Sequence, residues 1–264
     1  MTLQEDLAAE QEALATLLDG ADADAWATPS PSPGWTVADQ LAHLLFFDVR
    51  FTEAVSDPRA FLTELGRSRS MGRDAYRLDA LVQGHRLADG DLLGAWRASR
   101  PALLAAVASA APAVRVPWYG PSMGLRTAVT ARLMEAWAHG QDVVDALSLT
   151  REPTPRLRHV AFLGVRSRAN GYVVRGLDVP DAPVRVELRA PDGQRWAWGP
   201  EDCDDRVVGP AEDFCLVVTR RRHPTDVGLS VVGPAAVSWM AVAQAYAGVP
   251  GVDRQPGQFA RAAR

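Results

Sequence analysis

The sequence has few cysteines: Cys203 and Cys215 are the only two in 264 residues, and they do not form a CxxC pair. A disulfide framework needs more cysteines, and a thiolate zinc site needs closely spaced pairs of them. Neither kind of site is therefore expected. The two thiols are predicted to stay reduced, as in a cytoplasmic protein.

Long apolar runs and a basic leader are also missing. No stretch reaches the roughly 18 apolar residues of a membrane-spanning helix. The first residues, MTLQEDLAAEQEAL, are acidic and amphipathic, whereas a signal peptide has a basic segment followed by an apolar one. We therefore expect neither a membrane-spanning helix nor a signal peptide.

Lysine is absent, so all 28 basic residues are arginine, which indicates a GC-rich coding bias. Because acidic residues outnumber them, the formal net charge is -4, and the chain has no general attraction for nucleic acid or anionic membranes. The 47% hydrophobic content is typical of a globular protein with a core. We expect a small-molecule substrate, and a monomer or homodimer.

The first 150 residues have helical periodicity. Four helices are predicted, over residues 3–19, 37–56, 90–110 and 123–147. Pro101 is expected to kink or divide the third, and the polar residues 57–88 are interpreted as a connection with at most a short helix. Four helices with polar connections predict an antiparallel four-helix bundle.

The pattern changes after residue 150. VRVELRA and RWAWG flank the turn PDGQ and predict a β-hairpin. Residues 156–175 and 234–248 predict helices, LSVVG predicts a strand, and EDFCLVV fits either. Residues 253–264 predict a poorly ordered tail. The expected fold is thus α+β, with a helical domain at 1–150 and a smaller α+β domain at 151–264.

The segment RLMEAWAHGQDVVDAL, residues 132–147, places Glu135 and His139 four positions apart among apolar residues. Side chains at this spacing share one helix face and can bind one ion together. Alone, however, the pair also fits an ion pair on a helix surface.

A third candidate ligand is His43, in the apolar helix of PGWTVADQLAHLLFFD. A buried imidazole needs a polar partner, and a lone one is more often a core residue than a ligand. In an antiparallel bundle, though, His43 can converge with Glu135 and His139. Two histidines and one carboxylate match a catalytic zinc site, which keeps one coordination position open.

PGWTVADQLAHL and EAWAHGQDV resemble the N-terminal domain of mycothiol-dependent maleylpyruvate isomerases, within the wider DinB-like metal-binding bundles. In that family a histidine of the second helix and a Glu-x3-His of the fourth hold a divalent metal. The resemblance carries these roles to His43, Glu135 and His139. EDFCLVVTRRRH and VSWMAVAQAYAGVPG resemble an actinobacterial subgroup described only as metal-binding, which leaves the substrate open.

Two carboxylates lie near these ligands in the sequence. Asp48 or Asp142 could accept the second ring N–H of a metal-bound histidine, or each could be an exposed helix charge. His85 is interpreted as a surface residue, with an extra ligand as the alternative. Trp118 and Tyr119 fit a pocket mouth or simple packing.

The run of Arg220, Arg221 and Arg222 could bind carboxylates of a substrate or thiol, because guanidinium groups pair bidentately with them. It could equally be the solvated end of a helix, where cations are favoured. Arg50 is a further candidate for carboxylate binding.

The resemblance implies a metalloenzyme, with zinc the preferred ion, that uses mycothiol as a thiol cofactor or co-substrate. A metal-bound thiol ionises near neutral pH and can attack an electrophilic carbon, giving an isomerase or an S-transferase. One alternative is a thiol-independent metalloenzyme, a hydrolase, isomerase or lyase of a biosynthetic pathway, in which the ion activates water or a carbonyl. Another is a non-catalytic metal-binding module, which needs a fourth protein ligand.

Overall fold

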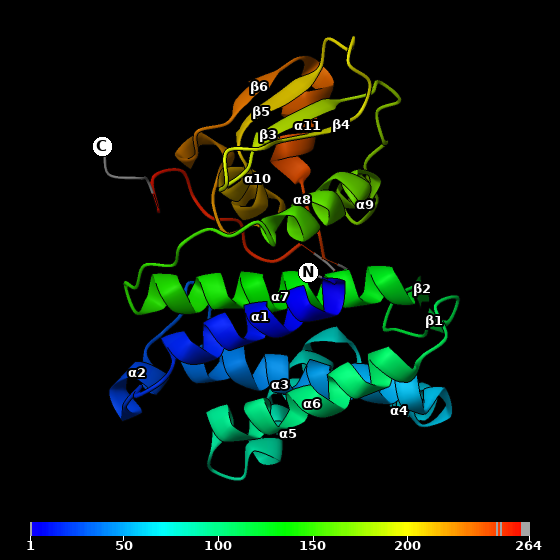
Figure 1. Cartoon of the computed structure of the whole chain (residues 1–264), viewed down its shortest axis with the longest axis vertical. Coiled ribbons are helices and arrows are strands. Elements are labelled where there is room, and N and C mark those ends of the chain that lie inside the picture. The colour runs from blue at the N-terminus through cyan, green and yellow to red at the C-terminus, as the bar shows by residue number, and fades with distance from the viewer. Residues whose placement is uncertain (1, 247, 249, 260–264) are drawn as a thin grey trace. The chain divides into compact units, whose positions relative to one another are not determined.

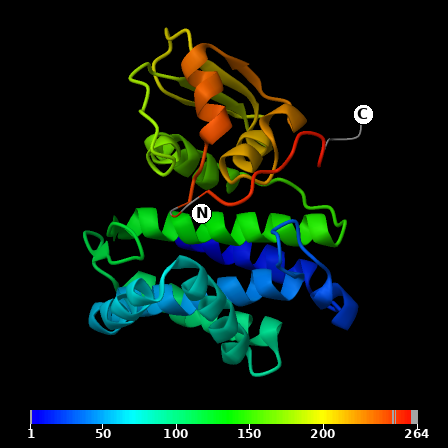
Figure 2. The same ribbon diagram turned by 180° about the vertical axis from the view of Figure 1, so that it is seen from behind.

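A computed structural model describes residues 2–246, 248 and 250–259 (Figures 1 and 2). The chain divides into two compact units, residues 1–150 and 151–264. The first is helical apart from one short hairpin, and the second combines helices with a small sheet. The protein is thus a mostly helical member of the α+β class.

The first unit contains the four long helices that the periodicity predicts. They are α1 (Leu3–Leu17), α3 (Val37–Ser56), α6 (Leu92–Ser109) and α7 (Leu125–Ala146). Figure 1 shows α1 beside α7 and α3 beside α6, and α3 also packs on α7. Their apolar faces form a buried core that includes Leu14, Leu41, Leu45, Trp96 and Val143. Pro101 does not divide α6, which runs through it as one helix.

The start of α3 is fixed by a capping box between Thr36 and Asp39. The hydroxyl of Thr36 accepts the backbone N–H of Asp39 at 3.2 Å, and the Asp39 carboxylate accepts the backbone N–H of Thr36 at 2.9 Å. This reciprocal pair satisfies two N–H groups that would otherwise lack a helical partner. It sets the first residue of α3 and hence the face on which His43 lies.

Residues 57–88 differ from the predicted connection, because they form two helices, α4 (Pro58–Met71) and α5 (Arg73–Ala88). The Asp57 carboxylate caps α4 by accepting the N–H of Ala60. At Gly84, an added Cβ would lie 2.2 Å from the carbonyl oxygen of Ala42, so α5 packs closely on α3 beside His43. The remaining elements are α2 (Ala23–Ala27), β1 (Arg115–Val116) and β2 (Met123–Gly124).

The second unit is built on a four-stranded sheet with the order β4-β3-β5-β6. Its strands are β3 (Arg185–Arg189), β4 (Arg195–Trp198), β5 (Arg206–Pro210) and β6 (Ser230–Val232). β3 and β4 form the predicted antiparallel hairpin. The sequence did not indicate β5, which pairs in parallel with β3 at the centre of the sheet.

The helices of the second unit depart from the predictions in their bounds. They are α8 (Leu157–Arg166), α9 (Arg168–Val173), α10 (Ala211–Val218), the 3-10 helix η1 (Pro224–Asp226) and α11 (Pro234–Val242). The single helix expected over 156–175 is divided at Ser167, and the ambiguous EDFCLVV is helical.

The last segments also differ from expectation. α11 ends at Val242 rather than at Gly248. Within the tail expected to be poorly ordered, Arg254 is buried and the N–H of Gly257 donates to Asp226 at 2.8 Å, while residues 260–264 lie outside the described residues. Among the helices described, none has the length and apolarity needed to cross a membrane.

Candidate metal centre

The structure brings together the three residues that the sequence nominates as ligands. His43 projects from α3, and Glu135 and His139 project from successive turns of α7; one nitrogen or oxygen of each lies within 4.8 Å of the other two. His139 Nε2 is 3.1 Å from Glu135 Oε2, and His43 Nε2 is 3.9 Å from the same oxygen. The two imidazole rings are 4.4 Å apart between centroids. A single ion could contact all three.

The protonation states suit metal binding. Burial lowers the pKa of His43, and the nearby His139 and Arg132 lower it further, so the imidazole is neutral. Burial raises the pKa of Glu135, but the hydrogen bonds with His139 and His43 outweigh this effect and hold it well below its usual value. The cluster therefore offers a neutral imidazole and a carboxylate without prior loss of a proton.

Gln40 fixes the orientation of His139. Its side-chain N–H donates to the Ser30 hydroxyl at 2.8 Å, which turns its carbonyl oxygen toward His139 Nδ1 at 2.5 Å. Nδ1 therefore carries a ring proton, and Nε2 is the nitrogen that faces Glu135 Oε2, at 3.1 Å. In the neutral imidazole Nε2 has a lone pair, so a cation between Nε2 and Glu135 Oε2 could bind both atoms.

Trp35 covers both imidazoles. Its ring centroid lies 5.2 Å from that of His43 and 6.0 Å from that of His139, nearly parallel to the latter. Phe47, one turn after His43 on α3, also packs on the His43 ring, with a centroid distance of 4.6 Å. The side chains of His43 and Glu135 keep 20% and 24% of their surface exposed, so one side of the cluster remains accessible.

The prediction that Asp48 orients a ligand histidine requires correction. Its carboxylate is buried and accepts hydrogen bonds from Arg132, Gln11 and Trp96. These three bonds occupy its oxygens, and Gln40 takes the position at His139 instead. Asp142 is fully buried rather than exposed, and it accepts a hydrogen bond from Ser32 at 3.2 Å.

His85 lies outside the cluster. Its Nε2 is 2.8 Å from Asp39 Oδ1, and 43% of its side chain is exposed. Among the residues that the structure describes, the group of His, Cys, Asp and Glu around the candidate centre has three members. A structural zinc site is normally closed by four protein ligands.

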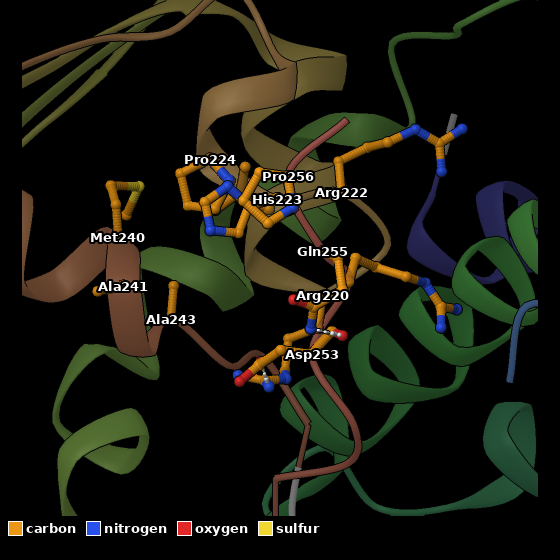
Figure 3. A pocket seen from close by; sticks show the side chains of 12 residues that line it. Arg220, Arg222, His223, Pro224, Met240, Ala241, Ala243, Asp253, Gln255 and Pro256 are labelled. Atoms are coloured by element: carbon orange, nitrogen blue, oxygen red, sulfur yellow. Dashed lines mark hydrogen bonds and ion pairs between the residues drawn. The ribbon is translucent and has the colours of Figure 1, made fainter. Parts of the chain in front are cut away.

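The three arginines of the second unit do not act as one group. Figure 3 shows Arg220 and Arg222 beside a cavity of about 290 Å³ that His223, Met240 and Asp253 also line. Arg220 is largely buried and pairs with Asp253. Arg221, which does not line this cavity, donates to the carbonyl of Thr219 at 2.7 Å. The side chains diverge because α10 ends just before them and Arg220 adopts a left-handed φ of 62°.

A match to a family model shows the protein family to which the chain belongs. Residues 7–144, which contain all three candidate ligands, match the model of the mycothiol maleylpyruvate isomerase N-terminal domain. The chain is a member of this family. A second model, for wyosine base formation, matches residues 180–230, which run from just before β3 to the start of β6.

Relatives within the family include two from strains of Mycobacterium tuberculosis, "Uncharacterized protein Rv0036c" and "Uncharacterized protein MT0041". Each is 42% identical over 249 residues, which cover 94% of this chain and 96% of the relative. The crystal structure of the mycothiol-dependent maleylpyruvate isomerase matches with a TM-score of 0.55 at 16% identity, over 88% of this chain and 93% of the isomerase. A mutant of that isomerase matches similarly, with a TM-score of 0.56. At this identity, the likeness to these solved structures shows a shared fold.

Proposed function

We propose that His43, Glu135 and His139 bind a divalent metal ion, most suitably zinc, and that the protein uses it for chemistry on a small molecule. The observation that carries this proposal is the convergence of three donor atoms from α3 and α7 within 4.8 Å. Two imidazole nitrogens and one carboxylate oxygen are the donor set of catalytic zinc sites. The four long helices act in this proposal as the metal-binding bundle, and residues 151–264 as a separate domain.

The orientation of His139 supports a cation at this position. With Nδ1–H donated to Gln40, Nε2 is the atom that faces the carboxylate of Glu135, at 3.1 Å, and in the neutral imidazole it is an acceptor. Two acceptors at this distance repel each other unless a proton or a cation lies between them. A metal ion satisfies both, and His43 provides the third donor.

The reaction that we propose is isomerisation or S-transfer with a low-molecular-weight thiol, mycothiol by family membership. When bound here, the ion supplies a positive charge that lowers the pKa of a thiol ligand. The chain provides the remaining conditions. Gln40 keeps the ring proton of His139 on Nδ1, Trp35 and Phe47 shield the imidazoles from water, and the exposed side of His43 and Glu135 leaves access for the thiol and an electrophilic substrate.

Elemental analysis of the purified protein tests the metal centre directly. We expect about one equivalent of metal, lost on His43→Ala or His139→Ala with the fold intact by circular dichroism. His85→Ala is the matched control, because this histidine is exposed and paired with Asp39, and it should retain full metal content. Stoichiometric metal in both ligand variants refutes the assignment.

Thiol use is tested by thermal shift of the metal-loaded protein with mycothiol. A ligand that binds only the native state raises the unfolding temperature, and the rise grows as the ligand concentration exceeds Kd. Stabilisation at millimolar thiol, absent from His139→Ala, supports the thiol-dependent reaction. A metal-loaded protein that mycothiol does not stabilise favours a thiol-independent metalloenzyme, in which the ion activates water or polarises a carbonyl.

In the second unit, we propose that the cavity beside Arg220 and Arg222 binds an anionic group of a substrate or thiol. Both arginines line a cavity large enough for a small ligand. Arg222→Ala should therefore raise the Michaelis constant more than it lowers the unfolding temperature, whereas Arg221→Ala, outside the cavity, should leave the constant unchanged. An unchanged constant in Arg222→Ala refutes this role for the cavity.

A further inference from the structure

One wall of the cavity beside Arg220 comes from the segment after α11, and the function proposed above gives this wall no role. Residues 253–259 of this segment are called the strap below, and residues 253–256 line the cavity. The other lining residues belong to α10, to the turn and 3-10 helix that follow it, or to the end of α11 and the residues just after it. Figure 3 shows the strap beside Arg220, with the Asp253 carboxylate on the guanidinium group.

The strap is held by few contacts. The backbone N–H of Gly257 donates to the Asp226 carboxylate at 2.8 Å, and the Phe259 ring lies 4.4 Å from Cζ of Arg222. Residues 251–258 are exposed apart from Arg254. A segment with so few buried residues opens at a lower free energy than the core of its domain.

The ion pair between Asp253 and Arg220 is unequal. The Asp253 side chain is 67% exposed, whereas that of Arg220 is 8% exposed. Arg220 Nε is also buried, and within the described part of the chain it has no hydrogen-bond partner. When the pair separates, the carboxylate loses little because water already solvates most of it. The guanidinium group, in contrast, is left as an unpaired buried charge, which is strongly unfavourable.

We propose that the strap is a ligand-operated gate: an anionic ligand of the cavity pairs with Arg220 in place of Asp253, and the strap opens as it does so. Without a ligand, the cost of an unpaired Arg220 keeps the strap closed. A ligand shifts the equilibrium toward the open state because it reaches Arg220 only there. The inference rests on the proposed function, because the cavity must first bind an anion, and it adds that binding and opening are coupled.

Calorimetric titration of the full chain with inorganic phosphate, at constant ionic strength, tests the competition at Arg220. Asp253→Asn removes the competing carboxylate and should bind phosphate about fivefold more tightly than the wild type, the factor that corresponds to an exposed ion pair of about 1 kcal/mol. Arg220→Gln should weaken binding at least about tenfold. Asp192→Asn is the matched control, because it makes the same change at an exposed aspartate in the β3–β4 turn, and it should bind as the wild type does.

Phe259→Ala separates opening of the strap from a simple change of charge. It removes the ring that lies against Arg222 and leaves every charge at the cavity in place. The closed strap loses a contact that the open strap does not make. Phosphate should therefore bind about two- to fivefold more tightly, the range expected for an exposed contact between a cation and an aromatic ring.

Hydrogen exchange followed by mass spectrometry measures the opening itself. The N–H of Gly257 is bonded to Asp226 in the closed strap, and this bond must break before the amide exchanges. Saturating phosphate should speed up exchange across residues 253–259 at least about threefold. A ligand that leaves the strap in place would slow this exchange or leave it unchanged.

The outcomes separate the strap from the anion site. Unchanged or slower exchange with phosphate bound overturns the strap even if Asp253→Asn binds more tightly, since charge alone then explains the gain. Wild-type affinity in both Asp253→Asn and Phe259→Ala, or in Arg220→Gln, also overturns the strap alone. If phosphate binds neither the wild type nor these variants, the anion site of the proposed function and the strap both fail.

Discussion

Two buried polar clusters lie on the same pair of helices, and they differ in how completely their atoms are bonded. In the first, Asp48 on α3 accepts hydrogen bonds from Arg132 on α7, Gln11 on α1 and Trp96 on α6, all between 2.9 and 3.0 Å. One carboxylate thus joins the four long helices. Both of its oxygens accept hydrogen bonds, and its charge is balanced by Arg132.

In the second cluster, His43, Glu135 and His139 face one another with fewer bonds than their atoms can make. His139 Nε2 and His43 Nε2 both face Glu135 Oε2, at 3.1 and 3.9 Å, and part of the cluster remains exposed. A buried network whose central carboxylate is bonded to three helices contributes rigidity to the fold. A cluster of converging imidazole and carboxylate groups has capacity for a ligand. We therefore expect the Asp48 cluster to stabilise the fold and the histidine cluster to bind the metal ion. Substitutions that change stability and metal affinity separately test this expectation.

Asp48→Ala should have the largest effect, and on stability. It leaves Arg132, only 4% exposed, as an unpaired buried charge, and breaking such a pair costs about 3–5 kcal/mol. Urea denaturation of the metal-free protein measures the loss. Asp19→Ala is the control: it breaks an ion pair with Arg97 in which Asp19 is 53% exposed, and should cost less than about 1 kcal/mol.

The Asp48 variant should still bind about one equivalent of metal under conditions in which it is folded. Metal affinity that falls together with stability would mean that the two clusters act as one unit, and the contrast between them would then be wrong.

Substitution of Gln40 or of Gln11 by alanine tests the difference between the two clusters further. Gln40→Ala removes the partner of His139 Nδ1 and should weaken metal binding about 10–100-fold, as is typical for a group that orients a ligand histidine. Gln11→Ala removes a donor to Asp48 and should lower the free energy of unfolding by about 1–3 kcal/mol without changing metal affinity. Chelator competition and urea denaturation measure both quantities on both variants. Similar profiles for the two variants would contradict the separation.

The proximity of His43, Glu135 and His139 could be predicted because it depends on helix geometry. The four-residue spacing puts Glu135 and His139 on one face, and the capping box at Thr36 fixes where α3 begins. The same geometry could have excluded Asp48. At 3.6 residues per turn it lies about 140° around the helix from His43, whereas Gln40 lies about 60° away. The position of Gln40 on the helix face of His43 could thus have been read from the sequence, although Gln40 is uncharged and was not considered as a partner of a ligand histidine.

Other features depend on tertiary packing and could not be predicted. Residues 57–88 have weak periodicity, and α4 is helical because Phe61 and Leu65 are buried against the rest of the unit. RVVGP looks like a loop because of its glycine and proline, yet pairing with β3 and β6 makes it a strand. The divergence of the arginine run follows from the backbone of Arg220, which the sequence does not specify.

The pH dependence of the metal-free protein gives a smaller effect. The folded pKa of His43 lies well below its ordinary value of 6.5, so below that pH the unfolded chain binds a proton that the folded chain does not. The free energy of unfolding should therefore fall as the pH falls, by up to about 1.4 kcal/mol per pH unit. The lowered pKa of Glu135 acts in the same direction below its ordinary value of 4.5. His43→Ala should flatten the slope between about pH 6 and pH 5; an unchanged slope would assign it to other groups.

Ser30→Ala should have the smallest effect, because Ser30 acts on the metal only through Gln40. The lost hydrogen bond is neutral, at 2.8 Å, and its loss should weaken metal binding about 2–10-fold. Ser32→Ala is the matched comparison, since this hydroxyl donates to Asp142 rather than to Gln40. If Ser32→Ala weakens metal binding more than Ser30→Ala does, then Asp142 is the group that orients the centre. If Ser30→Ala has the larger effect, as predicted, the amide of Gln40 is the group that orients the metal centre.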